Sequence, residues 1–199
     1  MKYGFLHTAA VSPALHVADC AYNTQQIIAA MRAQAVAGTK LLCLPEFTLT
    51  GFTCSDLFLQ ETLCRGAEDG LIQILDASKE LDVVALVGLP VRHNGKLYNC
   101  AAVVCKGQLL GLVPKTYLPN GNEFYETRWF ASGAGVHETV SRDGLTFPLS
   151  ADTLFEMGGF VFGVELCEDL WVPLPPSSHL AVELSLIHIS EPTRQAEIS

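Results

Sequence analysis

Apolar and polar residues alternate in blocks along the chain, and the blocks change from strand to helix periodicity. A short apolar run covers residues 3–10 and predicts a strand. A helix is predicted from Asn23, its N-cap, to about Gly38, with apolar side chains at helical spacing: Ile27, Ile28, Met31 and Ala35. The apolar segment KLLCLPE (40–46) then has the composition of a buried strand. Together these segments predict one β-α-β unit.

The same order of elements then repeats. A second helix is predicted from about Ala67 to Leu81, and it leads into the apolar strand DVVALVGLPV (82–91). Asn94-Gly95 is a strong signal for a two-residue hairpin turn, and Lys106-Gly107 opens another before QLLGLVP. Hairpins join antiparallel strands, so we expect a mixed sheet.

A polar stretch from residue 115 to about residue 143 interrupts this regular pattern and is rich in Gly and Asn. Long loops in compact domains are usually functional, so we interpret it as the rim of an active site. The segment GGFVFGVELC (158–167) predicts a further strand. Residues 1–183 contain no internal repeat or linker and are predicted to be one α/β domain.

The last sixteen residues, 184–199, differ from the rest of the chain. Their sequence begins LSLIHISEPTR, which resembles the conceptual translation of a transposase-type sequencing adapter. We therefore interpret 184–199 as a non-native tail and exclude it from fold reasoning. A natural amphipathic segment is the alternative.

Composition and charge narrow the classes of partner. The chain is 49% hydrophobic and 17% charged, with a net charge of −9 and no cluster of Lys or Arg. This argues against a surface for nucleic acid or an anionic membrane, and it favours small-molecule partners. The start has no signal-peptide pattern and no apolar window approaches a bilayer-spanning length, so secretion and membrane insertion are not expected.

The seven cysteines are odd in number and scattered, and none has a CxxC or Cys/His metal spacing. Neither a disulfide framework nor a zinc site is favoured, and no metal ligand is nominated. This usage is typical of a reducing compartment, so we expect a cytoplasmic protein.

Three reactive side chains follow predicted buried strands: Glu46, Lys115 and Cys167. Ligands gather at the carboxyl ends of strands in α/β sheets, so these groups can meet in one crevice. The stretch ELCEDLW places the thiol among carboxylates, which disfavour a thiolate, so a nucleophilic cysteine needs a base and a cation from elsewhere. Taken singly, the acid and the lysine are more often solvent-facing strand ends and the cysteine a small buried hydrophobe.

Three sequence blocks resemble those of the nitrilase superfamily, the carbon–nitrogen hydrolases with a Glu-Lys-Cys triad: PEFTLTGF, PKTYLPNGNEFYETRWF and GVELCEDLWVPLPPSS. Within it, TGFTCSDLF and CEDLWVPLPPSS are similar to the N-terminal glutaminase domain of glutamine-dependent NAD synthetases. The resemblance covers residues 1 to about 183 and implies a four-layer α-β-β-α sandwich that is incomplete.

The resemblance also implies roles for individual residues. Glu46 would be the general base, Lys115 the electrostatic stabiliser, and Cys167 the nucleophile that forms a γ-glutamyl thioester and releases ammonia. The backbone N–H that follows Cys167 would complete the oxyanion hole. Glu126 matches a second acidic residue that holds the lysine and substrate, with Glu123 as the alternative.

Three further positions have expected roles around the site. Phe124 matches an aromatic wall of the glutamine pocket. Gly121 stands where these synthetases usually carry an aromatic residue that packs on glutamine, so the chain loses contact area there. Asp169 is expected to fix the turn after the nucleophile through backbone hydrogen bonds.

The function implied is glutamine hydrolysis that supplies ammonia for amidation of deamido-NAD to NAD. ATP and magnesium would act in a synthetase domain outside residues 1–183, and no cofactor is expected in this one. The family commonly pairs these domains, which implies a homo-oligomer when complete, whereas the isolated chain is expected to be inactive. The alternatives are a stand-alone amidase or carbamoylase and a catalytically idle scaffold.

Overall fold

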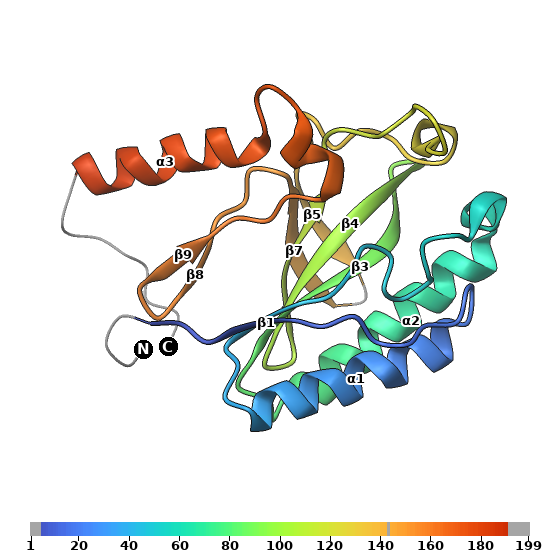
Figure 1. The fold of residues 1–199 in the computed structure, drawn as a ribbon, viewed down its shortest axis with the longest axis horizontal. Helices are drawn as coiled ribbons and strands as arrows, with labels where there is room; N and C mark the ends of the chain where they lie inside the picture. The colour runs from blue at the N-terminus through green and yellow to red at the C-terminus, as the bar shows by residue number, and fades with distance from the viewer. Residues whose placement is uncertain (1–4, 143, 191–199) are drawn as a thin grey trace.

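The computed structural model describes residues 5–142 and 144–190. Its main element is a seven-stranded mixed sheet in the order β1-β2-β3-β4-β5-β7-β6 (Figure 1). The strands are β1 (Thr8–Ala10), β2 (Leu41–Cys43), β3 (Val84–His93), β4 (Lys96–Cys105), β5 (Gln108–Pro114), β6 (His137–Arg142) and β7 (Leu145–Ser150). The helices are α1 (Cys20–Val36), α2 (Glu61–Ser78) and α3 (Pro176–Ser190), with short 3₁₀ turns η1 (Ser55–Leu59), η2 (Glu126–Arg128) and η3 (Cys167–Trp171).

The predicted order of parallel and antiparallel strands is confirmed. Strands β1, β2 and β3 are parallel, and β3, β4 and β5 are antiparallel neighbours. At both hairpins the two turn residues have positive φ: Asn94 and Gly95 at 47° and 74°, and Lys106 and Gly107 at 46° and 80°. This backbone matches the twist of hairpin strands and favours Asn and Gly at these positions.

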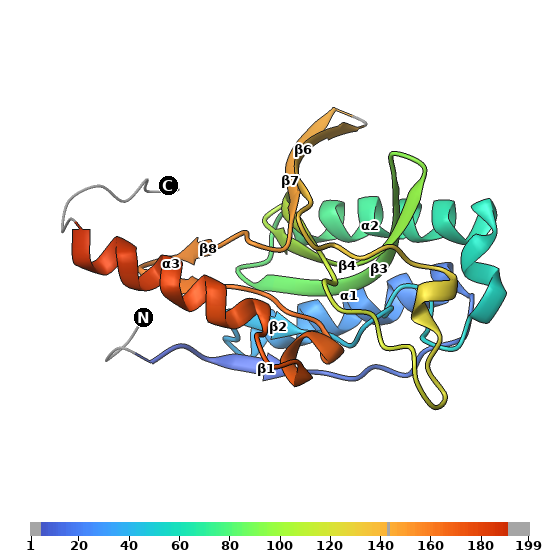
Figure 2. The same ribbon diagram turned by 90° about the horizontal axis from the view of Figure 1, so that it is seen from above.

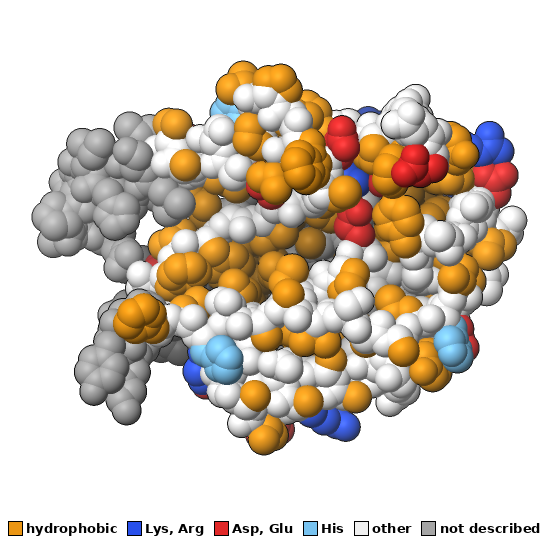
Figure 3. Space-filling view, in the orientation of Figure 1, with side chains coloured by type: hydrophobic (Ala, Val, Ile, Leu, Met, Phe, Trp, Pro, Cys, Tyr) orange, Lys and Arg blue, Asp and Glu red, His pale blue; other side chains and the backbone are white. Residues whose placement is uncertain are grey.

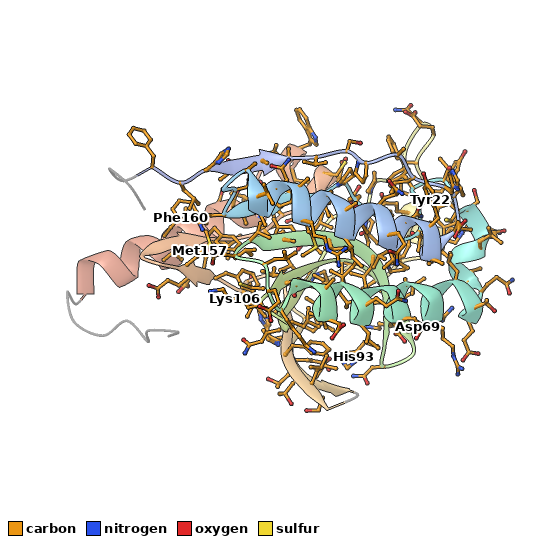
Figure 4. The ribbon with its side chains drawn as sticks, turned by 90° about the horizontal axis from the view of Figure 1, so that it is seen from below. Tyr22, Asp69, His93, Lys106, Met157 and Phe160 are labelled. Carbon is orange, nitrogen blue, oxygen red and sulfur yellow. The ribbon has the colours of Figure 1, made fainter. Side chains whose placement is uncertain are left out.

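The two faces of the sheet are covered differently. Helices α1 and α2 lie side by side on one face, where Ile27, Met31 and Ile74 form the core with the buried strands (Figure 4). On the other face, a hairpin of β8 (Phe155–Met157) and β9 (Phe160–Phe162) packs Phe155 and Phe162 against the sheet.

Helix α3 completes the layer order. It lies beyond the β8–β9 hairpin, as Figure 2 shows from above. The layers therefore follow the order helix, sheet, sheet, helix, and the second sheet has two strands within the described part of the chain. This is the mixed α/β architecture that the sequence predicts.

Helix α1 begins earlier than predicted. Its N-cap is Asp19, whose carboxylate accepts the backbone N–H of Tyr22. Asn23 lies inside the helix and is fully buried, where its side chain bonds the backbone of His16 and Leu49. Asp and Asn are both good N-cap residues, so the sequence alone did not distinguish them. Helix α2 likewise begins at Glu61 rather than Ala67.

Two predictions about strands were wrong. The segment 158–167 is not one long strand, because only Phe160–Phe162 pairs, and it pairs with β8 rather than with the main sheet. Strands β6 and β7 were missed, since β6 lies inside the stretch interpreted as a loop and its sequence HETVSR has little apolar alternation.

The predicted boundary at residue 184 falls inside α3, which extends to Ser190. Residues 191–199 of the predicted tail lie outside the described residues. All seven cysteines carry free thiols. Within the described ranges, none of the helices combines the length and apolar content that a membrane crossing requires.

Candidate active site

The candidate site is built from three chain segments that leave the sheet at one end. Glu46 follows β2, Lys115 follows β5 directly, and Cys167 begins η3. Glu46 and Cys167 line one cavity of about 480 Å³. The structure thus brings together segments far apart in sequence.

Lys115 is buried between two carboxylates. Its Nζ lies 2.9 Å from Oε1 of Glu46 and 3.0 and 3.1 Å from Oε1 and Oε2 of Glu126. The side chain of Lys115 is 0% exposed, and that of Glu126 is 5% exposed. Two buried charged groups, Lys115 and Glu126, and the partly buried Glu46 therefore satisfy one another, as buried charges must.

The electrostatics favour a protonated lysine. Burial lowers the pKa of Lys115, but the Glu46 and Glu126 carboxylates raise it, and the net shift is above the usual 10.5. Burial raises the pKa of Glu126 above 4.5 even though Lys115 opposes this. At neutral pH Lys115 therefore stays protonated and cannot act as a base.

The Cys167 thiol is exposed and protonated at rest. Partial burial and the Glu46 carboxylate raise its pKa above the usual 9.0, while Lys115 lowers it to a smaller extent. The backbone of Cys167 has a φ of 45°, which is uncommon for a residue with a side chain. Such strain persists only where the surrounding structure holds the turn.

Asp169 holds this turn, as predicted. Its carboxylate accepts backbone N–H groups from Leu166 at 3.1 Å, Tyr117 at 2.7 Å and Thr116 at 3.1 Å. Asp169 is 1% exposed. One carboxylate therefore joins the turn that carries Cys167 to the segment that follows Lys115.

The cavity beside Cys167 runs along the sheet. Most of its other lining is apolar and comes from the sheet and the segment 163–166, including Leu86, Ala101, Val164 and Leu166, while Glu165 of that segment also lines it. Figure 3 shows hydrophobic side chains gathered in a hollow on this side of the molecule. The site therefore combines a charged end with an apolar wall.

A second, smaller cavity of about 120 Å³ lies on the far side of Glu126. Its lining is largely aromatic and includes Phe47, Phe52, Phe58, Phe124, Tyr125, Trp129 and Phe130. Phe124 is half-buried here and meets Phe52 edge to face, with ring centroids 6.5 Å apart. The structure thus puts Phe124 in an aromatic pocket that Glu126 also lines.

The remaining two residues of the predicted site lie on the loop before η2. Glu123 is exposed, and it is Glu126 that contacts Lys115. Gly121 is also exposed, and its carbonyl oxygen accepts the Phe124 N–H at 3.0 Å. A side chain added at Gly121 would meet no atom within 4 Å.

Sequence reasoning missed two contributors to this site. Asn99 on β4 donates from Nδ2 to Oε1 of Glu46 at 3.0 Å, and its only sequence signal is one polar residue in an apolar strand. Asp56 on η1 binds Arg128 at 2.7 and 2.9 Å and the Trp129 indole at 2.8 Å. These bonds fix η2, which begins with Glu126.

Gly88 on β3 allows the segment that carries Glu46 to approach the sheet. A Cβ at this position would lie 2.7 Å from the Pro45 carbonyl oxygen and would also clash with the backbone N of Phe47. Both neighbours are backbone atoms, so Gly88→Ala must displace this segment. We expect a loss of about 1–3 kcal/mol in unfolding free energy, measured by urea denaturation, with lower activity. An unchanged urea denaturation curve would contradict the close approach.

Gly121→Ala is the matched control for stability. It adds the same methyl group where no atom lies within 4 Å and where φ is not positive. We expect its unfolding free energy to stay within about 0.5 kcal/mol of the parent.

Comparison with known proteins identifies the family. A sequence profile of the carbon-nitrogen hydrolase family matches residues 7–183. A glutamine-dependent NAD(+) synthetase from Mycobacterium bovis is 39% identical over 184 residues, which are 91% of this chain and 27% of that relative. The chain belongs to the carbon-nitrogen hydrolase family.

Solved structures show the same fold. A glutamine-dependent NAD(+) synthetase from Cytophaga hutchinsonii superposes with a TM-score of 0.76 at 29% identity, covering 82% of this chain and 28% of that one. An amidase from Nesterenkonia sp. superposes with a TM-score of 0.55 at 20% identity, covering 73% and 54%. The chain thus spans roughly a quarter of the length of its synthetase relatives.

Proposed function

We propose that this chain is the glutamine-hydrolysing part of a glutamine-dependent NAD synthetase, and that Glu46, Lys115 and Cys167 carry out the hydrolysis. The observation that supports it most strongly is the buried Lys115, held between two carboxylates beside the cavity that Glu46 and Cys167 share. The synthetase relatives support the choice of glutamine as the substrate.

The reaction begins with a neutral thiol. As Cys167 Sγ attacks the side-chain carbonyl of glutamine, Glu46 accepts the thiol proton, so no free thiolate has to form among the carboxylates. Lys115 and the backbone N–H of Glu168 stabilise the negative charge that develops on the carbonyl oxygen. Because donors fixed in advance need no reorganisation, a buried ammonium suits this role.

The attack forms a tetrahedral intermediate, which then collapses. Glu46 returns its proton to the departing nitrogen, the C–N bond breaks, and ammonia leaves behind a γ-glutamyl thioester on Cys167. Glu46 next takes a proton from water, which attacks the thioester and releases glutamate. The thiol is regenerated, and each proton that Glu46 accepts is returned within the cycle.

The ammonia would be consumed in a second region of the parent protein, outside this chain. There, ATP and magnesium would activate deamido-NAD for amidation. The proposed partners are glutamine and this synthetase region. Copies of the complete protein are proposed to form a homo-oligomer. Among the described residues, no group of three or more His, Cys, Asp or Glu side chains could hold a metal ion.

The function is tested by ammonia release from glutamine in the complete protein that contains this chain. We expect Cys167→Ala to lower the rate by about 10⁴-fold or more, because no other group replaces the nucleophile. Acetamide and propionamide should be much poorer substrates than glutamine. Equal activity on these small amides would instead favour a stand-alone amidase, and full activity of Cys167→Ala would refute the assigned nucleophile.

A further inference from the structure

Asn99 is a polar residue in the middle of a buried strand. It lies on β4 opposite Pro90 of β3, and its side chain is 0% exposed. The residues that follow it on β4, from Cys100 to Val104, are all buried and apolar. Most buried polar groups have at least one hydrogen-bond partner, so a buried amide in such a strand points to specific partners.

The partners of Asn99 are the charged groups of the site. Its Nδ2 donates to Oε1 of Glu46 at 3.0 Å, the same oxygen that accepts Lys115 Nζ at 2.9 Å. Its backbone carbonyl accepts the Lys115 N–H at 2.8 Å. Asn99 also lowers the pKa of Glu126, although less than Lys115 does. One residue therefore bonds the Glu46 carboxylate and the backbone of Lys115, and it acts on the titration of Glu126.

The charge balance explains why a neutral donor is needed. Glu46 and Glu126 carry two negative charges around the single ammonium group of Lys115. The amide N–H groups of Asn99 provide a further donor without adding a second cation. A second cation would stabilise a thiolate at Cys167, and the thiol proton would then not be left for Glu46 to accept. The titratable groups around this cluster are Cys167, Glu168 and Asp169, all on η3.

The orientation of the amide is set by the carboxylates. Within the described part of the chain, Oδ1 of Asn99 is buried and has no hydrogen-bond partner. Rotating the amide by 180° would turn this acceptor toward the Glu46 carboxylate, which can only accept. The arrangement thus leaves one acceptor unpaired in order to donate to the acids.

We propose that Asn99 is a positioning residue for the hydrolytic reaction: its Nδ2 holds Oε1 of Glu46 against Lys115 Nζ, where Glu46 can accept the thiol proton. This inference rests on the proposed function. A carboxylate that loses a donor takes up a proton at higher pH, so loss of Asn99 should weaken the base mainly under acidic conditions.

The test is the pH dependence of kcat/KM for glutamine in the complete protein. For Asn99→Leu we expect the acid limb to move up by about one pH unit, so that kcat/KM at pH 6 falls about 10-fold beyond any loss at pH 8. The KM should change little. Asn99→Ser, which keeps a donor in a smaller side chain, should shift the limb less and serves as the second variant if Asn99→Leu does not fold.

Asn23→Leu is the matched control, since Asn23 is also 0% exposed but bonds backbone groups around α1. It should lower stability without moving the acid limb. An unmoved acid limb in a folded Asn99 variant, or an equal shift in Asn23→Leu, would overturn the proposal.

A ¹³C NMR titration of the glutamate carboxyl groups provides a readout that does not depend on turnover. We expect the pKa of Glu126 to be higher in Asn99→Leu than in the parent. If the parent releases no ammonia, the proposed function fails. The titration still tests Asn99 in that case, and unchanged carboxyl titrations would refute its role.

Discussion

Replacing Lys115 with Met is expected to lower the free energy of unfolding by about 3–5 kcal/mol and to abolish glutamine hydrolysis. Met fills a similar volume but leaves the buried Glu126 and the partly buried Glu46 without their shared cation. The two carboxylates then repel each other, and this penalty exceeds the loss of packing. The unfolding free energy is measured by urea denaturation at neutral pH.

Two further variants separate this effect from a general loss of charge. Lys40 forms an exposed ion pair with Asp82, so Lys40→Met should cost less than about 1 kcal/mol. Adding Glu126→Gln to Lys115→Met removes one unpaired acid and should recover part of the stability but none of the activity. Equal losses for Lys40→Met and Lys115→Met would contradict a buried charge cluster.

Replacing Glu46 with Gln is expected to lower turnover by about 10²–10⁴-fold while making the Cys167 thiol more acidic. The Glu46 carboxylate is the largest charge effect that raises the pKa of this thiol, so its removal should lower that pKa. In most thiol enzymes a more acidic cysteine is more reactive. Here the opposite outcome is expected for hydrolysis, since Glu46 is also the proton acceptor.

The thiol pKa is measured from the rate of alkylation by iodoacetamide as a function of pH. In the parent protein the rate should reach its half-maximum above pH 9.0, because the folded pKa is raised above that value. Glu168→Gln is the control, since Glu168 also raises the thiol pKa and the variant keeps its backbone N–H. It should make the thiol slightly more acidic and leave turnover within a few-fold. A parent thiol that titrates below pH 7 would indicate a resting thiolate.

The raised pKa of Cys167 also has a consequence for stability. A thiol whose pKa is higher in the folded than in the unfolded state binds its proton more tightly when folded. The stability that it contributes is present below the unfolded pKa and is lost as pH rises through the folded value. The pKa of Lys115 is also raised, so this group acts in the same direction at still higher pH.

Local signals in the sequence were enough to predict much of the fold. Asn94-Gly95 and Lys106-Gly107 need positive φ, and this requirement fixed both hairpins and the antiparallel part of the sheet. The β6–β7 hairpin was missed because the residues of β6 are mostly polar and its pairing depends on tertiary contacts. The nucleophile segment is a turn held by Asp169, not a strand, and this depends on hydrogen bonds from distant backbone.

The site could be predicted where a reactive side chain follows a buried strand, as for Glu46 and Lys115. The resemblance favoured Glu126 over Glu123, and the structure agrees, since of these two only Glu126 bonds Lys115. Asn99 gave little signal because its role depends on groups that are distant in sequence. Pairwise contacts between loops cannot be read from local composition.

In the proposed reaction, Cys167, Glu46 and Lys115 act together on one bound amide. The most direct measurement is mass spectrometry of the complete protein, quenched with acid during turnover of glutamine. A mass increase of one glutamyl group is expected on the peptide that contains Cys167, absent in Cys167→Ala and strongly reduced in Glu46→Gln. Steady hydrolysis with no adduct on Cys167, or an adduct on a different residue, would contradict it.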